Sequence, residues 1–387
     1  MRVSNQRVPF LTHLHLRNWR NFIEAAIDPG RRAILVGPNA AGKTNLMDVV
    51  RFLRDVASEG VGFQEAVRRR GGVQRLRCLA ARQFSDLGVL LRIGNGEETA
   101  EWEYEIQFNQ EKQPKPVIKR ERLARSGEDL VVRPDREDLA DPERLRRTAL
   151  EQAGTFKDFR ALAAFLDSIR YVNIVPRIVR DPAHVSAGAI DPFGGDLIDR
   201  MAEIPEKSRN SRLRHIVEAV RPGVPHLMEL DVVRDPRGRP HLRARHGHWR
   251  AKGAWHEEDQ FSDGTLRLVG LLWETLDGDG PLLIEEPEIS LHAEIARLLP
   301  GVLSRLQRRT GRQVIMSTHS TELLQADGIR LDEILLLIPG REGTEVRPAI
   351  RAEEVQVLLD TGLGPAAASI EEGATAAEDR QMGLFAG

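Results

Sequence analysis

The chain has 387 residues, a length that predicts two to three domains, and 41% hydrophobic residues, enough for a sizeable core. With 56 Lys and Arg against 58 Asp and Glu, its formal net charge of -2 excludes a protein that coats nucleic acid by bulk charge and leaves a local basic patch open. A single cysteine excludes an intrachain disulfide. No apolar run approaches the ~20 residues of a membrane span, and the first twenty residues lack the apolar core of a signal peptide, so we expect a cytoplasmic chain without a membrane partner.

The first informative stretch reads as strand, glycine-rich turn and helix. Residues 33–36 form an unbroken apolar run, typical of a strand buried on both faces of a parallel sheet. Leu46, Val49, Val50 and Leu53 then recur on one face of a helix.

Between the strand and the helix lies a phosphate-binding pattern, G-x-x-x-x-G-K-S/T, matched at every fixed position. Backbone N–H groups of such a loop surround phosphates, and the helix N-terminus adds partial positive charge. Lys43 supplies a full charge for the outer phosphates, and the Thr44 hydroxyl is a ligand for Mg²⁺. The predicted nucleotide-binding set is Gly37, Pro38, Asn39, Ala40, Ala41, Gly42, Lys43, Thr44 and Asn45.

The middle of the chain changes from strand to helix patterns. Strict alternation over 101–108 predicts a half-buried antiparallel strand, with 117–123 as its partner in a side sheet. Helical patterns recur from about 141 to 220 and show no long heptad run. We therefore divide the chain into an N-terminal lobe, a mainly helical insertion, a C-terminal lobe and a mobile tail, at residues 1–115, 116–224, 225–350 and 351–387.

Three segments of the C-terminal lobe (281–285, 313–317 and 333–338) read as strands of the core sheet. The first ends in adjacent carboxylates, and ligands of open parallel sheets bind beyond the carboxyl ends of the strands. There Glu285 can hold Mg²⁺ and Glu286 can accept a proton from an attacking water. On its own, the motif is equally consistent with a solvated acidic turn.

Two weaker signals flank this strand. Ser262 can cap the amphipathic helix that follows it, and Gly264 keeps the first turn of that helix open to a phosphate. His319 lies two residues past the strand at 313–317, where it can contact a γ-phosphate or the attacking water. Taken singly, ordinary helix capping and a structural histidine are the better interpretations.

As an ordered set, these elements resemble the ABC-type ATPase heads, and among them the RecF/SMC/OLD-like group found in bacteria as "AAA family ATPase" proteins. The likeness covers residues 8–115 and 225–350. Its motifs, in chain order, are Leu16-Arg17-Asn18-Trp19-Arg20-Asn21-Phe22, the phosphate loop, Ser262-Asp263-Gly264-Thr265 as signature, Glu285-Glu286-Pro287-Glu288 to Leu291-His292 as Walker B and D-loop, and Ser317-Thr318-His319-Ser320 as switch.

The resemblance implies an α/β fold: a P-loop ABC-type ATPase head with a mixed core sheet flanked by helices, an antiparallel β side sheet and a helical insertion. The lobes at 1–115 and 225–350 would be the two halves of this head. The Q-loop glutamine of such heads has two candidates in this sequence, Gln74 and Gln83.

The resemblance also implies a mechanism with ATP and Mg²⁺ as cofactors. Two heads form a homodimer around two ATP molecules, and Ser262, Asp263 and Gly264 of one chain close in trans on the phosphate loop of the other. The implied catalytic residues are Lys43, Glu286 and His319, and the implied metal ligands are Thr44 and Glu285. Glu285 departs from the Asp that many ATPases carry there.

Within the group, the signature disfavours a transporter ATPase, and the lack of long arms disfavours a true SMC protein. OLD-family enzymes carry a nuclease domain, and the residues after Ile350 are too few for one, so we expect none. The first remaining interpretation is an ATPase subunit that regulates a separate effector protein, such as a nuclease, in a bacterial antiphage-defence or toxin-like module. The second is a RecF-like repair ATPase that binds DNA ends or gaps, and the third is a scaffold that uses ATP only to dimerise.

Nucleic acid thus remains open as a partner. The Arg runs at 68–70 and 237–250 can contact phosphate backbones, although solvated faces are the favoured interpretation. The histidines between 241 and 256 match no metal-ligand spacing.

Overall fold

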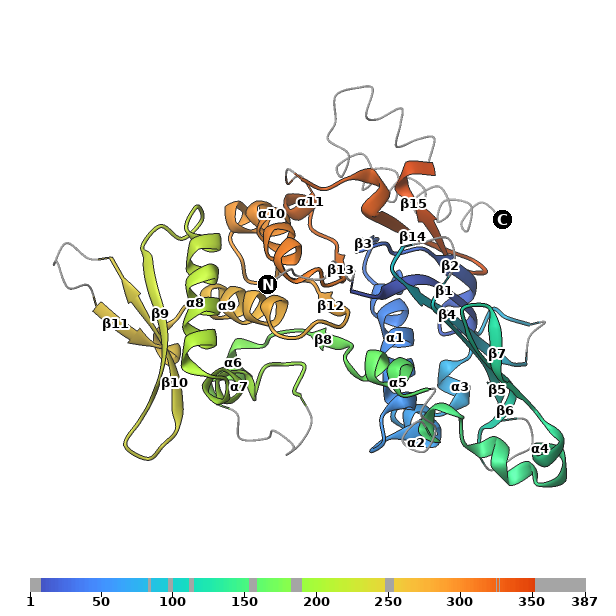
Figure 1. The fold of residues 1–387 in the computed structure, drawn as a ribbon. Coiled ribbons are helices and arrows are strands. Elements are labelled where there is room, and N and C mark those ends of the chain that lie inside the picture. Colours follow the sequence, from blue (N-terminus) through green and yellow to red (C-terminus); the bar gives the residue numbers. More distant parts are fainter. Residues whose placement is uncertain are drawn as a thin grey trace.

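A computed structural model of the chain describes residues 8–82, 85–96, 100–110, 115–152, 159–181, 190–247, 254–324, 326 and 328–351. These residues form three sheets (Figure 1): a core sheet in the middle, a side sheet next to it, and a small sheet at the opposite end of the molecule. Among them, no helix is both long enough and apolar enough to cross a membrane.

The core sheet has six strands in the spatial order β15-β14-β3-β13-β12-β8, parallel except for the antiparallel edge strand β15. In chain order the strands are β3 (Arg32–Val36), β8 (Arg170–Val172), β12 (Leu282–Glu285), β13 (Val314–Thr318), β14 (Ile334–Gly340) and β15 (Gly343–Pro348). Val36 of β3 lies opposite Thr318 of β13, and Ser317 lies opposite Glu285 of β12. The carboxyl ends of these three strands therefore meet at one edge of the sheet.

Alternate residues of the core strands enter two separate hydrophobic clusters, one on each face of the sheet. Ala33 and Leu35 join the cluster with α1 and the side sheet, whereas Ile34 and Val36 join the cluster with α8, α9 and α10. These helices are α1 (Lys43–Ala57), α8 (Glu206–Val220), α9 (Asp263–Leu276) and α10 (Ala293–Thr310). Each face of the core sheet is therefore covered by a layer, as strands buried on both faces require. The predicted mixed core sheet flanked by helices is confirmed.

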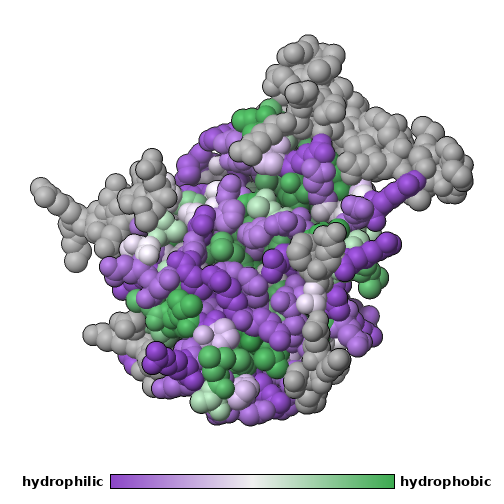
Figure 2. All heavy atoms as spheres, turned by 90° about the vertical axis from the view of Figure 1, so that its right-hand side faces the viewer, coloured by the Kyte–Doolittle hydropathy of each residue, from purple (hydrophilic) through white to green (hydrophobic). Residues whose placement is uncertain are grey.

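The side sheet is antiparallel, with the order β2-β1-β4-β5-β6-β7. Its strands are β1 (Phe10–Trp19), β2 (Phe22–Ile27), β4 (Leu87–Gly94), β5 (Trp102–Asn109), β6 (Val117–Arg125) and β7 (Glu128–Arg133). β6 pairs with β5 as predicted. Ion pairs cross the outer face, among them Arg92–Glu103 at 2.6 Å and Arg120–Glu105 at 3.1 Å. Figure 2 shows this side of the molecule as mostly hydrophilic with scattered apolar patches.

Residues 116–224 differ from the mainly helical insertion that the sequence predicts. β6 and β7 at its start belong to the side sheet, and β8 in its middle is an edge strand of the core sheet. β8 has only three residues, too few for a periodicity signal. Its helices are α4 (Arg136–Ala140), α5 (Arg160–Asp167), α6 (Pro176–Arg180), α7 (Leu197–Glu203) and α8, with 3-10 turns at Pro142–Arg146 and Leu150–Gln152.

The remaining elements complete the two lobes. The small sheet, β9 (Leu227–Arg234), β10 (Pro240–His246) and β11 (Ala254–Glu257), packs on α7 and α8. The short helices are α2 (Gly62–Arg69), α3 (Val73–Leu76) and α11 (Thr321–Leu324), with 3-10 turns at Glu258–Gln260, Leu331–Glu333 and Ala349–Arg351. The predicted tail over 351–387 lies, after its first residue, outside the described residues.

A fully buried arginine holds the turn that joins α9 to β12. The Arg312 guanidinium donates to the backbone carbonyls of Gly280, Glu274 (2.5 Å) and Asp277 (2.6 Å). Burial lowers its pKa to about 10, so it stays charged at neutral pH. Arg312 thereby fixes the helix that starts at Ser262 relative to the strand that ends at Glu285.

Replacing Arg312 by Met should cost about 2–4 kcal/mol in the free energy of unfolding, because buried carbonyls lose their donors. Urea unfolding measures this cost. Arg308→Met, at an exposed position of the last turn of α10, is the control and should change stability by about 1 kcal/mol or less. Equal stability of the two variants would contradict the anchoring role of Arg312.

Candidate active site

The phosphate loop, residues 37–44, joins β3 to α1, and its backbone requires its glycines. Gly42 has a φ of 99°, a left-handed conformation that L side chains rarely adopt. A Cβ on Gly37 would lie 2.6 Å from the carbonyl oxygen of Leu337 on β14. Ala40 is also left-handed, with a φ of 65°. Left-handed residues of this kind occur in anion-binding nests, which are formed by successive backbone N–H groups.

The side-chain amide of an asparagine from the side sheet holds this loop in place. Asn21, in the turn between β1 and β2, donates to the Ala41 carbonyl at 2.9 Å and to the Thr344 hydroxyl at 2.7 Å. Its side-chain oxygen accepts a hydrogen bond from Asn45 at 2.8 Å. The Asn45 side chain therefore helps to hold the loop in place, and a direct contact of Asn45 with nucleotide stays a prediction.

Lys43 folds back over the loop that precedes it. Its Nζ donates to the carbonyl oxygens of Gly37 (2.8 Å) and Pro38 (3.1 Å). Burial lowers the pKa of this ammonium below its ordinary value. The negative charges of Glu285, Glu286 and Glu288 act in the opposite direction. The structure thus places the one lysine of the loop beside the carboxylates that follow β12.

Thr44 and Glu285, both predicted metal ligands, are in direct contact. The Thr44 hydroxyl donates to Oε1 of Glu285 at the end of β12. A hydroxyl and a carboxylate, with phosphate oxygens supplied by a nucleotide, are the hard oxygen donors that Mg²⁺ prefers. The donor set at this edge of the core sheet therefore fits a magnesium ion.

Glu286 and His319 also meet, although 33 positions separate them. His319 Nδ1 donates to Oε1 of Glu286 at 2.9 Å, and the Glu286 backbone N–H donates to Ser317 at 3.1 Å. Glu286 has a φ of 42°, a strained conformation for a non-glycine residue of the kind that clusters at functional sites. Glu285 accepts from Thr44 whereas Glu286 accepts from His319, so the two adjacent carboxylates have different partners.

Glu288 has a more buried place in the site than the sequence indicates. The Thr318 hydroxyl donates to its Oε1 at 2.5 Å, and within the described residues its buried Oε2 has no hydrogen-bond partner. Burial raises the pKa of this carboxyl above its ordinary value, and the nearby charge of Glu286 adds to the rise. In the sequence, Glu288 is only part of the acidic motif after β12, and no local pattern indicates a role for it.

The signature turn, residues 262–264, begins α9 as predicted. The Ser262 hydroxyl accepts the Thr265 N–H at 3.1 Å, which is ordinary N-capping. Arg180 at the end of α6 pairs with Asp263 at 2.7 Å and donates to the Phe261 carbonyl at 2.8 Å. Sequence reasoning missed Arg180, because nothing in the pattern of α6 indicates its partner.

Gly264 allows the signature turn to lie against the turn that follows β12. A Cβ on Gly264 would lie 2.6 Å from the backbone carbonyl of Ser290. Ser290 is itself left-handed, with a φ of 67°. The signature and the D-loop are therefore packed against each other within one chain.

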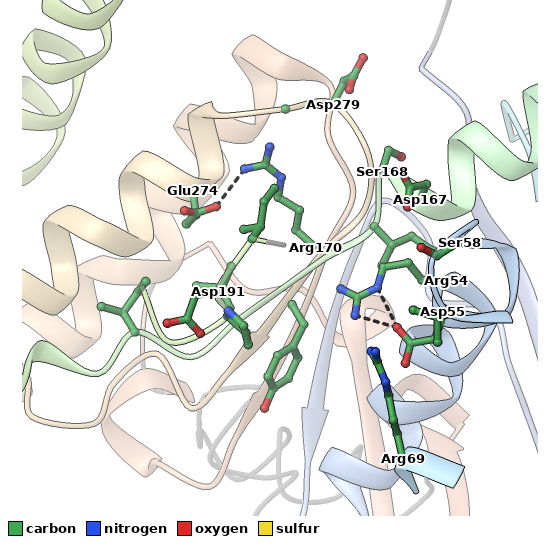
Figure 3. Close-up of a pocket in the computed structure, with 18 residues that line it drawn as sticks. Arg54, Asp55, Ser58, Arg69, Asp167, Ser168, Arg170, Asp191, Glu274 and Asp279 are labelled. Carbon is green, nitrogen blue, oxygen red and sulfur yellow. Dashed lines mark hydrogen bonds and ion pairs between the residues drawn. The ribbon is translucent and has the colours of Figure 1, made fainter. Parts of the chain in front are cut away.

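A cleft of about 440 Å³, separate from the phosphate loop, lies beside β8, between α1 and the turn after α9 (Figure 3). Its three arginines are neutralised: Arg54 pairs with Asp55 at 2.9 Å, Arg170 with Asp277 at 2.7 Å, and Arg69 with Glu65 at 3.0 Å. Opposite charges at this spacing offset the attraction that the cations would exert on an anion. The cleft thus lacks the free positive charge of a phosphate or nucleic-acid site.

In the two Arg runs of the sequence, 68–70 and 237–250, arginines are also paired with carboxylates. Arg68 and Arg69 pair with Glu65 on the exposed face of α2. Arg70, by contrast, is buried and bonds Asp48 and Asp55 of α1. In the second run, Arg243 pairs with Asp231 and Arg245 with Glu229. Of the Q-loop candidates, Gln74 lies in α3 and Gln83 lies outside the described residues.

Comparison with known proteins agrees with this geometry. The family model AAA_21, described as "AAA domain, putative AbiEii toxin, Type IV TA system", matches residues 32–325. The chain belongs to the AAA_21 family. The match includes the phosphate loop, the signature turn, the end of β12 and His319.

Two solved structures share the fold of this AAA_21 chain. The SMC head domain from Thermotoga maritima aligns with a TM-score of 0.50 and 16% identity over 88% of this chain and 98% of that one. An SMC head bound to the C-terminal winged-helix domain of ScpA aligns with a TM-score of 0.56 and 14% identity, covering 87% and 97%. At these identities the likeness concerns the fold alone.

Curated relatives of this AAA_21 chain are DNA replication and repair proteins named RecF. The protein from Rhizobium leguminosarum bv. trifolii is 41% identical over 98 residues, 24% of each chain, and that from Rhizobium meliloti is 47% identical over 58 residues, 15% of this chain and 14% of the relative. The matches thus span about a quarter or less of these relatives. Together the comparisons show an AAA_21 chain that has the fold of SMC heads and a stretch of sequence similar to RecF proteins.

Gly264→Ala should lower the melting temperature and cost about 1–3 kcal/mol of stability, because the added methyl group displaces the Ser290 carbonyl. Gly301→Ala in α10 is the matched control. The nearest atom to its added Cβ is the end of the Arg305 side chain at 4.0 Å, so the helix should gain about 0.5–1 kcal/mol. Thermal unfolding measures both changes. A neutral Gly264→Ala would contradict the close packing of signature and D-loop.

Proposed function

We propose that this chain binds ATP with Mg²⁺, hydrolyses it, and dimerises around it. The observation that supports this most strongly is the meeting of four predicted groups at one edge of the core sheet: the Lys43 ammonium, the Thr44 hydroxyl, and the Glu285 and Glu286 carboxylates. Each of these groups has a distinct part in phosphoryl transfer to water. A phosphate loop without the acidic strand end would support nucleotide binding alone.

In the proposed reaction, backbone N–H groups of the phosphate loop hold the phosphates, and Lys43 exchanges its loop carbonyls for the outer phosphate oxygens. Thr44 and Glu285 would hold a magnesium ion, and its charge would offset that of the phosphates. The oxygen of the attacking water bonds to the γ-phosphorus while the bond from that phosphorus to the bridging oxygen breaks, and ADP leaves with that oxygen. Glu286 accepts the proton that the water gives up, and His319 orients that carboxylate through the 2.9 Å hydrogen bond. His319 also lies where it can respond to the γ-phosphate.

The second copy of the chain supplies the other side of the site in this proposal. The N-terminus of α9 carries Ser262 and Gly264 on an exposed turn, and a helix N-terminus favours phosphate. Asp263 would repel that phosphate, and its ion pair with Arg180 offsets the repulsion. The turn can contact a partner's triphosphate only when ATP fills the gap between the two chains. Nucleotide binding therefore controls formation of the dimer.

We further propose that the dimer regulates a separate effector protein, such as a nuclease, in a bacterial defence or toxin-like module. The family description, which names a toxin and a type IV TA system, supports this interpretation. The alternative is a RecF-like repair ATPase acting at DNA ends or gaps, which the identity to RecF proteins over the matched stretch favours. ATP hydrolysis measured with and without DNA separates them: strong stimulation by DNA in the absence of any effector supports the repair function.

Lys43→Ala should abolish nucleotide binding, because the loop loses its full positive charge while three carboxylates remain nearby. Equilibrium binding of a fluorescent ATP analogue measures this loss. Lys207→Ala, at an exposed position in the first turn of α8, is the control and should bind like the unmodified chain. Tight ATP binding by Lys43→Ala would count against the phosphate-loop role.

Glu286→Gln should stall hydrolysis and leave ATP-bound dimers long-lived, because an amide cannot take the proton from water. The drop in turnover should be on the order of 10²-fold or more, the contribution typical of a general base. Single-turnover kinetics and size-exclusion chromatography measure the two effects, with Glu128→Gln on the exposed hairpin of β7 as control. If Glu286→Gln hydrolyses ATP at the normal rate, Glu286 is not the base.

A further inference from the structure

Both carboxylate oxygens of Glu285 accept a hydrogen bond from a hydroxyl group. Thr44 donates to Oε1, and Tyr171 donates to Oε2. The first contact joins two predicted metal ligands, whereas the second comes from β8, a strand that the sequence analysis did not identify. The Tyr171 hydroxyl is thus the one described group that holds the far side of this carboxylate.

The tyrosine is itself rigidly placed. β8 pairs with β12 in parallel, with Tyr171 opposite Leu283, two residues before Glu285. The side chain is 7% exposed, and the Arg51 guanidinium from α1 lies 4.0 Å from the centre of its ring. The ring also forms part of the lining of the cleft beside β8. A strand register, a stacked cation and burial therefore fix where the hydroxyl points.

A glutamate at this position needs such a restraint more than an aspartate does. Its side chain has one more rotatable bond, so holding its carboxylate in one orientation costs more conformational entropy. A hydroxyl that bonds Oε2 limits that freedom and leaves Oε1 toward Thr44. Partners of this kind orient metal-binding side chains, and their loss commonly lowers metal affinity 10- to 100-fold.

We propose that Tyr171 is a positioning residue for the magnesium site, holding Glu285 in the orientation that lets it act together with Thr44. The inference rests on the proposed function, since it assigns a role within the same nucleotide site. It also bears on the choice of glutamate: an Asp carboxylate at 285 is one methylene shorter and would lie farther from the Tyr171 hydroxyl, so this contact favours Glu. Tyr171 and Glu285 should therefore behave as a coupled pair.

The test compares Tyr171→Phe with Tyr104→Phe in the full-length chain. Phe at 171 keeps the ring, its packing and the Arg51 contact, and removes only the hydroxyl. Tyr104 is the matched control, because its buried hydroxyl also donates to a glutamate, Glu121 at 2.9 Å, within the side sheet. A fluorescent ATP analogue is titrated with Mg²⁺ after removal of metal with EDTA, and Mn²⁺ bound with the nucleotide is followed by electron paramagnetic resonance.

Tyr171→Phe should raise the Mg²⁺ concentration for half-maximal nucleotide binding by roughly tenfold and change the Mn²⁺ spectrum, with affinity in EDTA unchanged. Tyr104→Phe should lower the melting temperature only. In a Glu285→Asp background, Tyr171→Phe should have no further effect on the Mg²⁺ requirement. An unchanged Mg²⁺ requirement in Tyr171→Phe overturns the inference alone, whereas an unmodified chain that binds no nucleotide overturns the proposed function and the inference with it.

Discussion

The site depends on the parallel register of β3, β13 and β12. Val36, Thr318 and Glu285 end their strands at the same edge of the core sheet, so the segments that follow them converge. A slip of one residue in any of these strands would exchange its two buried faces and remove its terminal group from that edge. The two hydrophobic clusters, which take alternate residues of β3, are therefore what specifies the geometry of the phosphate loop, the acidic turn and His319.

The electrostatics of this edge explain why a cation belongs with the nucleotide. Glu285, Glu286 and Glu288 all act on Lys43, which is itself partly desolvated. A triphosphate brought alone to three carboxylates would meet repulsion that one ammonium and a helix N-terminus offset only in part. A magnesium ion held by oxygen donors changes that balance. In this account the nucleotide binds together with the metal ion, so a change that weakens metal binding also weakens nucleotide binding in the presence of the metal. The contact from Tyr171 to Glu285 supports both.

The sequence was informative wherever a local pattern carries the chemistry. The strand at 33–36, the loop through Thr44, the acidic end of β12 and the cap at Ser262 are each written in a few consecutive residues, and the structure contains all of these elements. The side-sheet partner of 101–108 was predicted because alternation over a long strand is a strong signal. Roles of the site residues in binding and catalysis stay predictions.

Contacts between distant residues could not be predicted in this way. Tyr171 meets Glu285 across 114 positions, and Asn21 meets Thr344 across 323. β8 was missed because three residues carry no period, and the arginine that anchors Asp263 ends a five-residue helix whose pattern has no distinguishing feature. Such pairs depend on how the lobes pack, which no single stretch of sequence encodes.

The central claim is that this chain holds a triphosphate with its own phosphate loop while a second copy closes the site. Native mass spectrometry of the unmodified chain, with Mg²⁺ and a non-hydrolysable ATP analogue, tests it most directly. The account predicts a dimer that carries two nucleotides and reverts to single chains when the analogue is omitted. Single chains free of nucleotide under both conditions would contradict it.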